Sequence, residues 1–210
     1  EIEILSRYTS KIIKIIPYAV DTKLFSPSKK EKEDELIYLG RIAPIKDLET
    51  LIKVMSMVDS KAKLILAGPW ELECKEKLDN LVQDLDLNNR VKFIGPVYGF
   101  KEKAKLIADS GIFIIPSKRE GLPQSLLEAM AAGKIVISSS NKGGMELVKE
   151  GKNGFIFKIG DEKALANRLS YAINNFSKLG FMRKNAKKMA LEMTWVKIAD
   201  SVEKVYKSSK

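Results

Sequence analysis

The sequence contains no histidine and only one cysteine, Cys74, among its 210 residues. Without these side chains the chain has no Cys/His zinc site and no Ser-His or Cys-His catalytic pair of its own. A lone thiol excludes a disulfide scaffold and fits a reducing cytosol. No apolar run approaches the roughly 20 residues that a membrane-spanning helix needs. We therefore expect a globular protein with a cytoplasmic location.

Arginine is scarce as well, because it supplies only six of the 37 basic residues, against 27 acidic residues and a formal net charge of +10. A basic protein favours anionic partners such as phosphorylated ligands or anionic lipid. Few arginines and the lack of a groove-reading motif argue against nucleic acid as a partner. Residues 178–210 hold nine basic and three acidic side chains. This stretch is either a solvated helical face or a peripheral contact with an anionic membrane.

Short apolar runs alternate with amphipathic segments along most of the chain. The runs are rich in Ile and Val and bounded by Gly, Pro or Ser, which is typical of strands covered on both faces. The alternation predicts the α/β class, with a Rossmann-like, doubly wound, mostly parallel sheet and helices on both faces. The expected strands are Ile12–Ile16, Leu36–Leu39, Leu64–Ala67, Val91–Ile94, Ile112–Ile115, Ile135–Ser138 and Phe155–Phe157. The expected helices are Leu48–Val58, Glu71–Asp84, Lys101–Ala108, Gln124–Ala132, Met145–Val148, Ala164–Asn175, Lys184–Glu192 and Val196–Lys207, and the most linker-like stretch is Ser26–Glu35.

Glycine, proline and charged residues follow the expected strands. Gly40-Arg41 follows the first central run, and the segment Pro116–Gly121 follows Ile112–Ile115. Parallel strands end at the same edge of the sheet, and open α/β sheets bind ligands outside that edge. Ordinary turn chemistry would also place Gly and Pro after strands. The charged residues among them favour a ligand site.

One loop and the helix after it, Arg119–Gly133, carry most of the expected chemistry. A proline is tolerated in the first turn of a helix, so the helix begins near Pro123 and ends at Gly133. Its first free amides then point at the ligand edge, where anions bind well. Glu120 lies before the helix and Glu128 within it. The two carboxylates suit a ligand with both phosphates and hydroxyls, or they are a dipole partner and a surface residue.

The whole string resembles the retaining nucleotide-sugar glycosyltransferases of the GT-B architecture, specifically the large family 4. That family carries two glutamates separated by seven residues, followed by Ala-Met-Ala and Gly, and here these are Glu120 and Glu128. The resemblance runs from about residue 12 to 207 in the family's order and spacing. Further matching segments are Ile16–Asp21 with Phe25, Gly40–Lys46, Leu64–Gly68, Val91–Gly95, Gly143–Glu146 with Gly151–Phe157, and Thr194-Trp195.

The resemblance implies a role for each matching position. Arg41 and Lys46 would hold the diphosphate of a nucleotide-sugar donor, Glu120 the transferred sugar, Glu128 the ribose hydroxyls, and the backbone around Ile94 the base. Cations at the diphosphate stabilise the leaving group as the glycosidic bond breaks, so the implied catalytic residues are Arg41, Lys46 and Glu120. No metal and no cofactor are implied, since these cations and the helix end replace them. The donor-binding residues implied are Gly40, Arg41, Lys46, Ile94, Glu120, Gly121, Leu122, Pro123, Gln124, Leu126 and Glu128, with the amides between Pro123 and Leu127.

The chain departs from the family at two positions. Tyr18-Ala19 replaces the usual Asn-Gly at the interdomain hinge, which puts the hinge geometry in doubt. Asp47 replaces the glycine often found after the lysine, and aspartate is acceptable at a helix start.

The chain also holds only the second of the family's two domains. We expect residues 1–11 to be the end of a preceding acceptor domain, whose last helix would be Ile2–Ser10. Residues 12–193 would form the nucleotide-sugar domain, and residues 194–210 a helix that packs back toward the first domain in cis. The chain begins Glu1-Ile2-Glu3, without a methionine, so we expect it to be part of a longer polypeptide.

Three functions therefore follow from the sequence. The first is the donor-binding half of a retaining hexosyltransferase that uses a UDP- or GDP-sugar, with an acceptor that is a sugar or lipid-linked. The second is a nucleotide-sugar epimerase of the same architecture, against which the Glu120-to-Glu128 string argues. The third is a non-catalytic nucleotide-sugar-binding or membrane-surface module.

Overall fold

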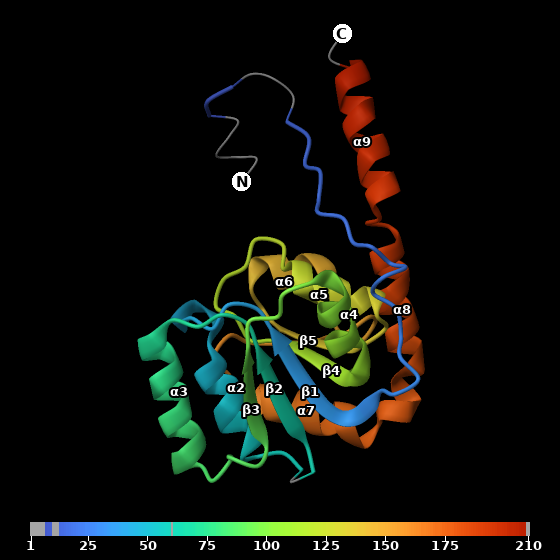
Figure 1. The fold of residues 1–210 in the computed structure, drawn as a ribbon. Helices are drawn as coiled ribbons and strands as arrows, with labels where there is room; N and C mark the ends of the chain where they lie inside the picture. The colour runs from blue at the N-terminus through green and yellow to red at the C-terminus, as the bar shows by residue number, and fades with distance from the viewer. Residues whose placement is uncertain (1–6, 10–12, 60, 209–210) are drawn as a thin grey trace.

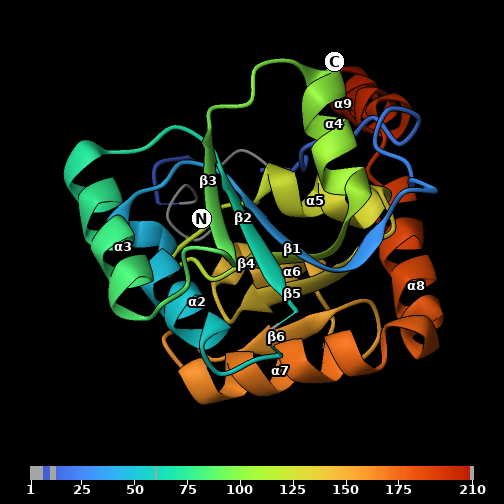
Figure 2. The same cartoon turned by 60° about the horizontal axis from the view of Figure 1, so that its bottom comes forward.

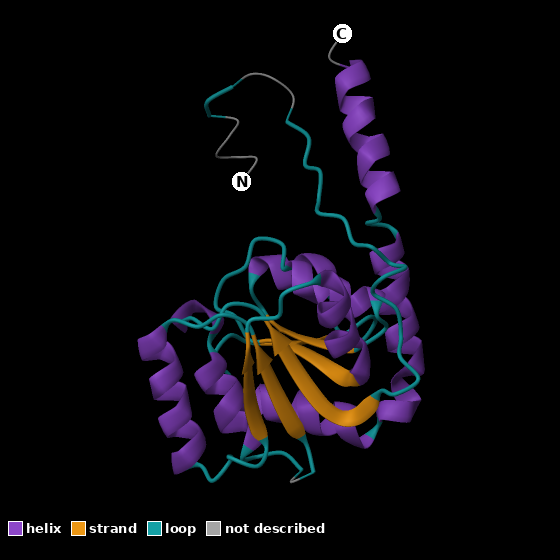
Figure 3. Cartoon of the chain, in the orientation of Figure 1, coloured by secondary structure: helices purple, strands orange, loops and turns teal. Residues whose placement is uncertain are grey.

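A single parallel sheet organises the domain. The computed structural model describes residues 7–9, 13–59 and 61–208, and within them six strands pair in the order β3-β2-β1-β4-β5-β6, every pair parallel (Figures 1 and 3). All residues of β4 and β5 are buried, as expected for central strands covered on both faces. The strands are β1 (Lys32–Leu39), β2 (Lys63–Ala67), β3 (Val91–Gly95), β4 (Ser110–Ile115), β5 (Ile135–Ser139) and β6 (Phe155–Phe157).

Helices cover both faces of the sheet, and alternate residues of each strand point to one or the other. On β1, Leu36 and Tyr38 pack against one set of helices, whereas Ile37 packs against the other. The first set is α2 (Leu48–Met55), α3 (Leu72–Asp84) and α7 (Glu162–Asn174), and the second is α4 (Phe100–Asp109), α5 (Gln124–Ala131), α6 (Lys142–Leu147) and α8 (Gly180–Leu191) (Figure 2). Two short 3₁₀ helices, η1 (Pro44–Lys46) and η2 (Phe176–Leu179), complete this part of the chain. The predicted Rossmann-like, doubly wound fold is confirmed.

The predictions for the N-terminal part of the chain do not agree with the structure. The strand expected at Ile12–Ile16 is wrong, because residues 13–16 have no regular structure and Ile15 is 68% exposed. The expected linker Ser26–Glu35 is too long, since β1 already begins at Lys32. Most of the expected helix Ile2–Ser10 and of the expected remnant 1–11 lies outside the described residues. The described part, residues 7–9, is not helical.

The last helix, α9 (Trp195–Ser208), projects away from the sheet and its covering helices (Figure 1). The residues just before α9 are bonded to the N-terminal segment that precedes β1, because the Val20 amide donates to the Met193 carbonyl at 2.8 Å. Beyond that point Trp195 and Tyr206 are 65% and 72% exposed. None of the described helices is both long and apolar enough to cross a membrane.

Candidate nucleotide-sugar site

A cavity of about 270 Å³ lies where the loops after β1 and β4 meet the start of α5. It brings together six of the residues implied by the resemblance, from two segments about 80 residues apart in sequence. Five further residues line it that are not among the donor-binding residues named from the resemblance, and the most notable is Lys103 of α4. The predicted residues at this cavity are Gly40, Lys46, Glu120, Leu122, Pro123 and Gln124, and the others are Tyr38, Leu39, Lys103, Ile115 and Ser125.

Lys46 and Glu120 form an ion pair at the cavity wall. Their Nζ and Oε1 atoms are 2.8 Å apart, and the side chains are only 18% and 13% exposed. The two loops are joined by backbone as well, because the Lys118 amide donates to the Ile45 carbonyl at 2.9 Å. A lysine and a glutamate that share one wall can meet a phosphate and a sugar hydroxyl of the same ligand.

Asp47, which follows Lys46, adopts a left-handed backbone conformation with φ of 53°. Glycine is favoured in that region, which gives a physical reason for the glycine that the resemblance implies at this position. The side chain of Asp47 is buried and accepts a hydrogen bond from Thr50 Oγ1 at 3.1 Å, and Lys118 Nζ lies 3.4 Å from its other oxygen. These contacts hold the turn, so the aspartate is accommodated at the start of α2 by specific partners and not by a favourable φ.

The N-terminus of α5 points its first turn at the cavity. Pro123 is the N-cap and Gln124 begins the helix, as predicted. The amides of Leu126 and Leu127 donate to the Pro123 carbonyl at 3.1 and 3.2 Å. The expectation that amides as far as Leu127 face the ligand is therefore too broad. The backbone amides of Gln124 and Ser125 are the ones that can still donate to a ligand, together with the positive end of the helix dipole. The Leu126 side chain belongs to the core.

Glu128 lies one turn into α5 and is almost completely buried, with 3% of its surface exposed. It does not line the cavity directly. Lys103 covers it, with Nζ 2.8 Å from Oε1 and 2.6 Å from Oε2. Burial raises the pKa of Glu128 above the usual value, and the contact with Lys103 opposes that rise. The sequence motif identified Glu128 but not its partner Lys103, which is the member of the pair that lines the cavity.

Arg41 does not line this cavity. Its Nη1 atom lies 3.5 Å from Glu71 Oε1 at the start of α3, and both side chains are more than half exposed. The backbone of the same loop is well fixed, because the buried Tyr38 hydroxyl donates to the Arg41 carbonyl at 2.8 Å. Burial raises the pKa of Tyr38, so the phenol stays protonated and remains a donor. A Cβ on Gly68 would lie 2.0 Å from the Gly40 carbonyl oxygen, which explains the glycine after β2.

Two further predicted positions, besides Arg41, Leu126 and Glu128, lie away from the 270 Å³ cavity. Ile94 is on the edge strand β3 and is 37% exposed. Gly121 lines a neighbouring cavity of about 400 Å³, which shares Glu120 and Leu122 with the first. The rest of its wall comes from Ile15–Tyr18, in the N-terminal segment before β1, and from Lys142 and Glu146 of α6. Glu120 therefore stands between the two cavities.

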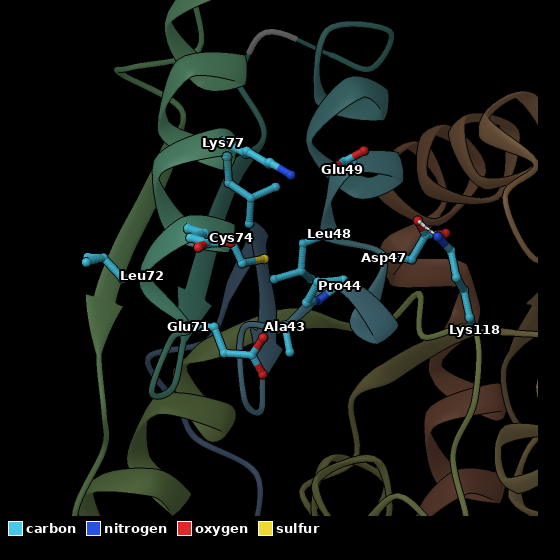
Figure 4. A pocket seen from close by; sticks show the side chains of 12 residues that line it. Ala43, Pro44, Asp47, Leu48, Glu49, Glu71, Leu72, Cys74, Lys77 and Lys118 are labelled. Carbon is cyan, nitrogen blue, oxygen red and sulfur yellow. Dashed lines mark ion pairs between the residues drawn. The ribbon is translucent and has the colours of Figure 1, made fainter.

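A further cavity of about 490 Å³ lies between η1, α2 and the start of α3 (Figure 4). Cys74 and Leu48 face one another across it, and the ion pair of Asp47 with Lys118 lies at one side. Four carboxylates and two ammonium groups line it, namely Asp47, Glu49, Glu71, Glu73, Lys77 and Lys118. This excess of negative charge disfavours a diphosphate, so the cavity with Lys46 and Lys103 is the better anion site.

Sequence reasoning missed Lys103 and Glu71. Lys103 is one of three lysines at alternate positions in α4, the others being Lys101 and Lys105. Nothing in that spacing indicates which of the three reaches inward, because the answer depends on how α4 is rotated against α5.

The fold and the site together define an α/β domain that can bind an anionic, hydroxyl-bearing ligand at the carboxyl edge of its sheet. Residues 20–189 match the family described as Glycosyl transferases group 1. The chain belongs to this family. The solved structures that it resembles are GT-B glycosyltransferases.

Individual relatives agree with this assignment. An uncharacterized glycosyltransferase of Methanocaldococcus jannaschii is 31% identical over 181 residues, which is 85% of this chain and 46% of that protein. The structure of HepE from Anabaena in complex with UDP and glucose is 25% identical with a TM-score of 0.86, covering 93% of this chain and 57% of HepE. The C-terminal domain of LpcC from Francisella tularensis, 20% identical, shares the fold with a TM-score of 0.75 over 82% of this chain and 97% of that domain. The chain thus spans about half the length of the curated relatives that it matches.

Proposed function

We propose that this chain is the donor-binding half of a retaining hexosyltransferase of family 4 and that its donor is a nucleotide-diphosphate sugar. The observation that carries the proposal is the shared cavity of Lys46, Glu120 and Lys103 with the start of α5. Its two ammonium groups and helix dipole suit a diphosphate, and Glu120 suits a sugar hydroxyl. We also propose, as the resemblance implies, that the donor binds without a metal, with Lys46 as a cation at the diphosphate.

The choice of base follows from the relatives. HepE is described in complex with UDP and with UDP-glucose, so a UDP-sugar is our first choice and a GDP-sugar our second. A relative in Salmonella typhimurium is named as a putative colanic acid biosynthesis glycosyltransferase, which supports an acceptor in polysaccharide synthesis. We propose that the acceptor site lies in a further domain of the whole protein and that this domain completes the reaction.

In the proposed reaction the acceptor hydroxyl attacks the anomeric carbon from the face that the diphosphate leaves. The new bond to the acceptor oxygen forms as the bond to the diphosphate oxygen breaks, and the departing diphosphate takes the hydroxyl proton. Lys46 stabilises the charge that develops on the leaving group. Glu120 orients the sugar, and no protein nucleophile is required.

The first test is the melting temperature of the chain with UDP, GDP and ADP, each with and without magnesium. A nucleotide at one hundred times its Kd stabilises a protein by about 2.7 kcal/mol, which raises Tm by about 5–10 °C at this size. We expect UDP to give the largest shift, with or without magnesium.

The variant Lys46→Met should weaken UDP binding at least about tenfold, because it removes a cation at the diphosphate. Its matched control is Lys53→Met, since Lys53 is also paired with a glutamate, Glu162 at 3.3 Å, but lies outside the cavity. No shift with any nucleotide, or equal effects of the two variants, would contradict the proposal.

A further inference from the structure

The Lys103–Glu128 pair combines features that a purely structural ion pair does not need. Lys103 is 21% exposed at the cavity wall, whereas the Glu128 side chain is 4% exposed beneath it. Lys103 Nζ also lies 5.9 Å from the centre of the Phe25 ring, so its position is fixed from a second side. The lysine is therefore the member of the pair that a ligand meets first.

One oxygen of Glu128 retains its capacity to accept a hydrogen bond. Lys103 donates to Oε1, whereas Oε2 lies close to the same nitrogen without a hydrogen bond of acceptable geometry. Among the side chains of the described residues, Glu128 Oε2 and Ser117 Oγ are the buried polar atoms that lack a hydrogen bond. The Lys103 ammonium group 2.6 Å away offsets part of the cost of burying Oε2, and the atom keeps a lone pair that can accept from a ligand.

The charge of Glu128 also depends on its neighbours. The groups that face it are Lys103 from α4 and Gln124 from its own helix, while Lys46 and Glu120 across the cavity are paired with each other. Burial raises the pKa of Glu128, and Lys103 is the main influence that lowers it. Without the ammonium group, a carboxyl this buried would be protonated over more of the neutral range.

We infer that Lys103 is a positioning residue of the nucleotide site, which fixes the Glu128 carboxylate beneath the cavity wall, so that a small shift of the Lys103 side chain lets Oε2 accept from a ribose hydroxyl. The inference rests on the proposed function, because it deepens the role of Glu128 at that site. Lys103 acts through Glu128 and does not replace it.

The test compares the affinity of the chain for UDP with its affinity for 2′,3′-dideoxy-UDP by isothermal titration calorimetry. The wild type and Glu128→Gln show whether the ribose hydroxyls are read at all. We expect Lys103→Met to weaken UDP about tenfold and dideoxy-UDP less than about twofold. Lys103→Arg should restore most of the loss. Lys105→Met is the matched control on the same helix, because Lys105 is 76% exposed and paired with Asp109.

A pH series separates positioning from simple loss of packing. Because Lys103 opposes the rise in the pKa of Glu128, lowering the pH from about 8 to 6 should weaken UDP binding less in the wild type and in Lys105→Met than in Lys103→Met. In Lys103→Met the pKa of Glu128 is higher, so affinity should be weakest at pH 6 and recover as the pH rises and the carboxyl ionises. If circular dichroism shows that Lys103→Met does not fold, the same measurements are made on Lys103→Gln, which keeps a hydrogen-bond donor but carries no charge.

The outcomes separate the two proposals. If the wild type binds no nucleotide, the proposed function fails. If the wild type distinguishes UDP from dideoxy-UDP and Glu128→Gln abolishes the difference, but Lys103→Met behaves as Lys105→Met does, the inference alone fails. Equal losses for both nucleotides in Lys103→Met would make Lys103 a phosphate contact and would also overturn it.

Discussion

Arg41 and Lys46 lie five residues apart in the loop after β1, yet their side chains pair with carboxylates from different elements. Lys46 pairs with Glu120 in a mostly buried contact, and Arg41 pairs with Glu71 in an exposed one. Exposed pairs contribute little, about 0–1 kcal/mol, whereas partly buried ones are screened less. A diphosphate can therefore recruit Arg41 at small cost by replacing Glu71 as its partner.

We predict that Glu71→Gln tightens UDP binding about two- to threefold, which corresponds to the energy of an exposed ion pair. The substitution removes the carboxylate that competes with the diphosphate for Arg41 and also removes one repulsive charge. Calorimetry at low and high salt measures the effect, which should shrink as salt screens it.

Glu73→Gln is the matched control for that change, because Glu73 lies in the first turn of the same helix and lines the same acidic cavity. It alters the net charge equally without touching Arg41. Equal tightening by both variants would show a general electrostatic effect, and weaker binding in Glu71→Gln would contradict the recruitment of Arg41.

At the scale of elements, the packing of α6 against the loop before α5 supports the site from behind. A Cβ on Gly143 would lie 1.9 Å from the Gly121 carbonyl oxygen and 3.0 Å from Pro123 Cδ. Gly143→Ala must therefore push the loop that carries Glu120. We expect a loss of stability of about 1–3 kcal/mol and weaker UDP binding, measured by urea unfolding and calorimetry.

Gly180→Ala serves as the control for this substitution, since an added Cβ there meets nothing within 4 Å and the residue is the first of α8. It should leave stability unchanged or slightly increased, because alanine is favoured over glycine in a helix. If Gly143→Ala were as stable as Gly180→Ala and bound UDP normally, the loop would not depend on α6.

The sequence predicts the elements well where apolar runs and breakers agree, and poorly where only one signal is present. β4 and α5 follow from a buried Ile-rich run, a proline start and a glycine stop. Ile12–Ile16 has the composition of a strand, but residues 13–16 lie beside no partner strand and remain irregular. Composition alone cannot supply that partner, because strand pairing is a tertiary property.

The residues of the site were likewise predicted in part. The topology brings Lys46 and Glu120 to one edge, so their proximity could be predicted from strand order. The partners of Glu128 and Arg41 could not, because a lysine on α4 and a glutamate at the start of α3 reach them only through the rotation of two helices. Motifs therefore mark the ligand-facing residues better than the residues that orient them.

At the scale of the whole molecule, basic residues gather toward the C-terminal helices. Lys184 and Lys188 of α8 are exposed and Lys187 is partly exposed. Farther along, Lys197 and Lys207 are neutralised by Glu192 and Glu203. Any attraction to an anionic surface is thus expected from α8 more than from α9. The projecting α9 instead carries exposed Trp195 and Tyr206.

The last prediction concerns that basic surface of α8. Vesicles with about 30% anionic lipid should bind the chain at low salt and release it as salt rises, because each lysine near the surface contributes about 1 kcal/mol and the field decays within a Debye length. The triple variant Lys184→Glu, Lys187→Glu and Lys188→Glu should abolish co-sedimentation. Its matched control changes three exposed lysines to glutamate, namely Lys61 just before β2, Lys63 in β2 and Lys92 in β3. Both triples alter net charge equally, so loss in the first alone assigns the contact to α8. Equal losses in both triple variants would show that binding depends on net charge and not on α8. Equal binding of the wild type to neutral and anionic vesicles would contradict an electrostatic contact altogether.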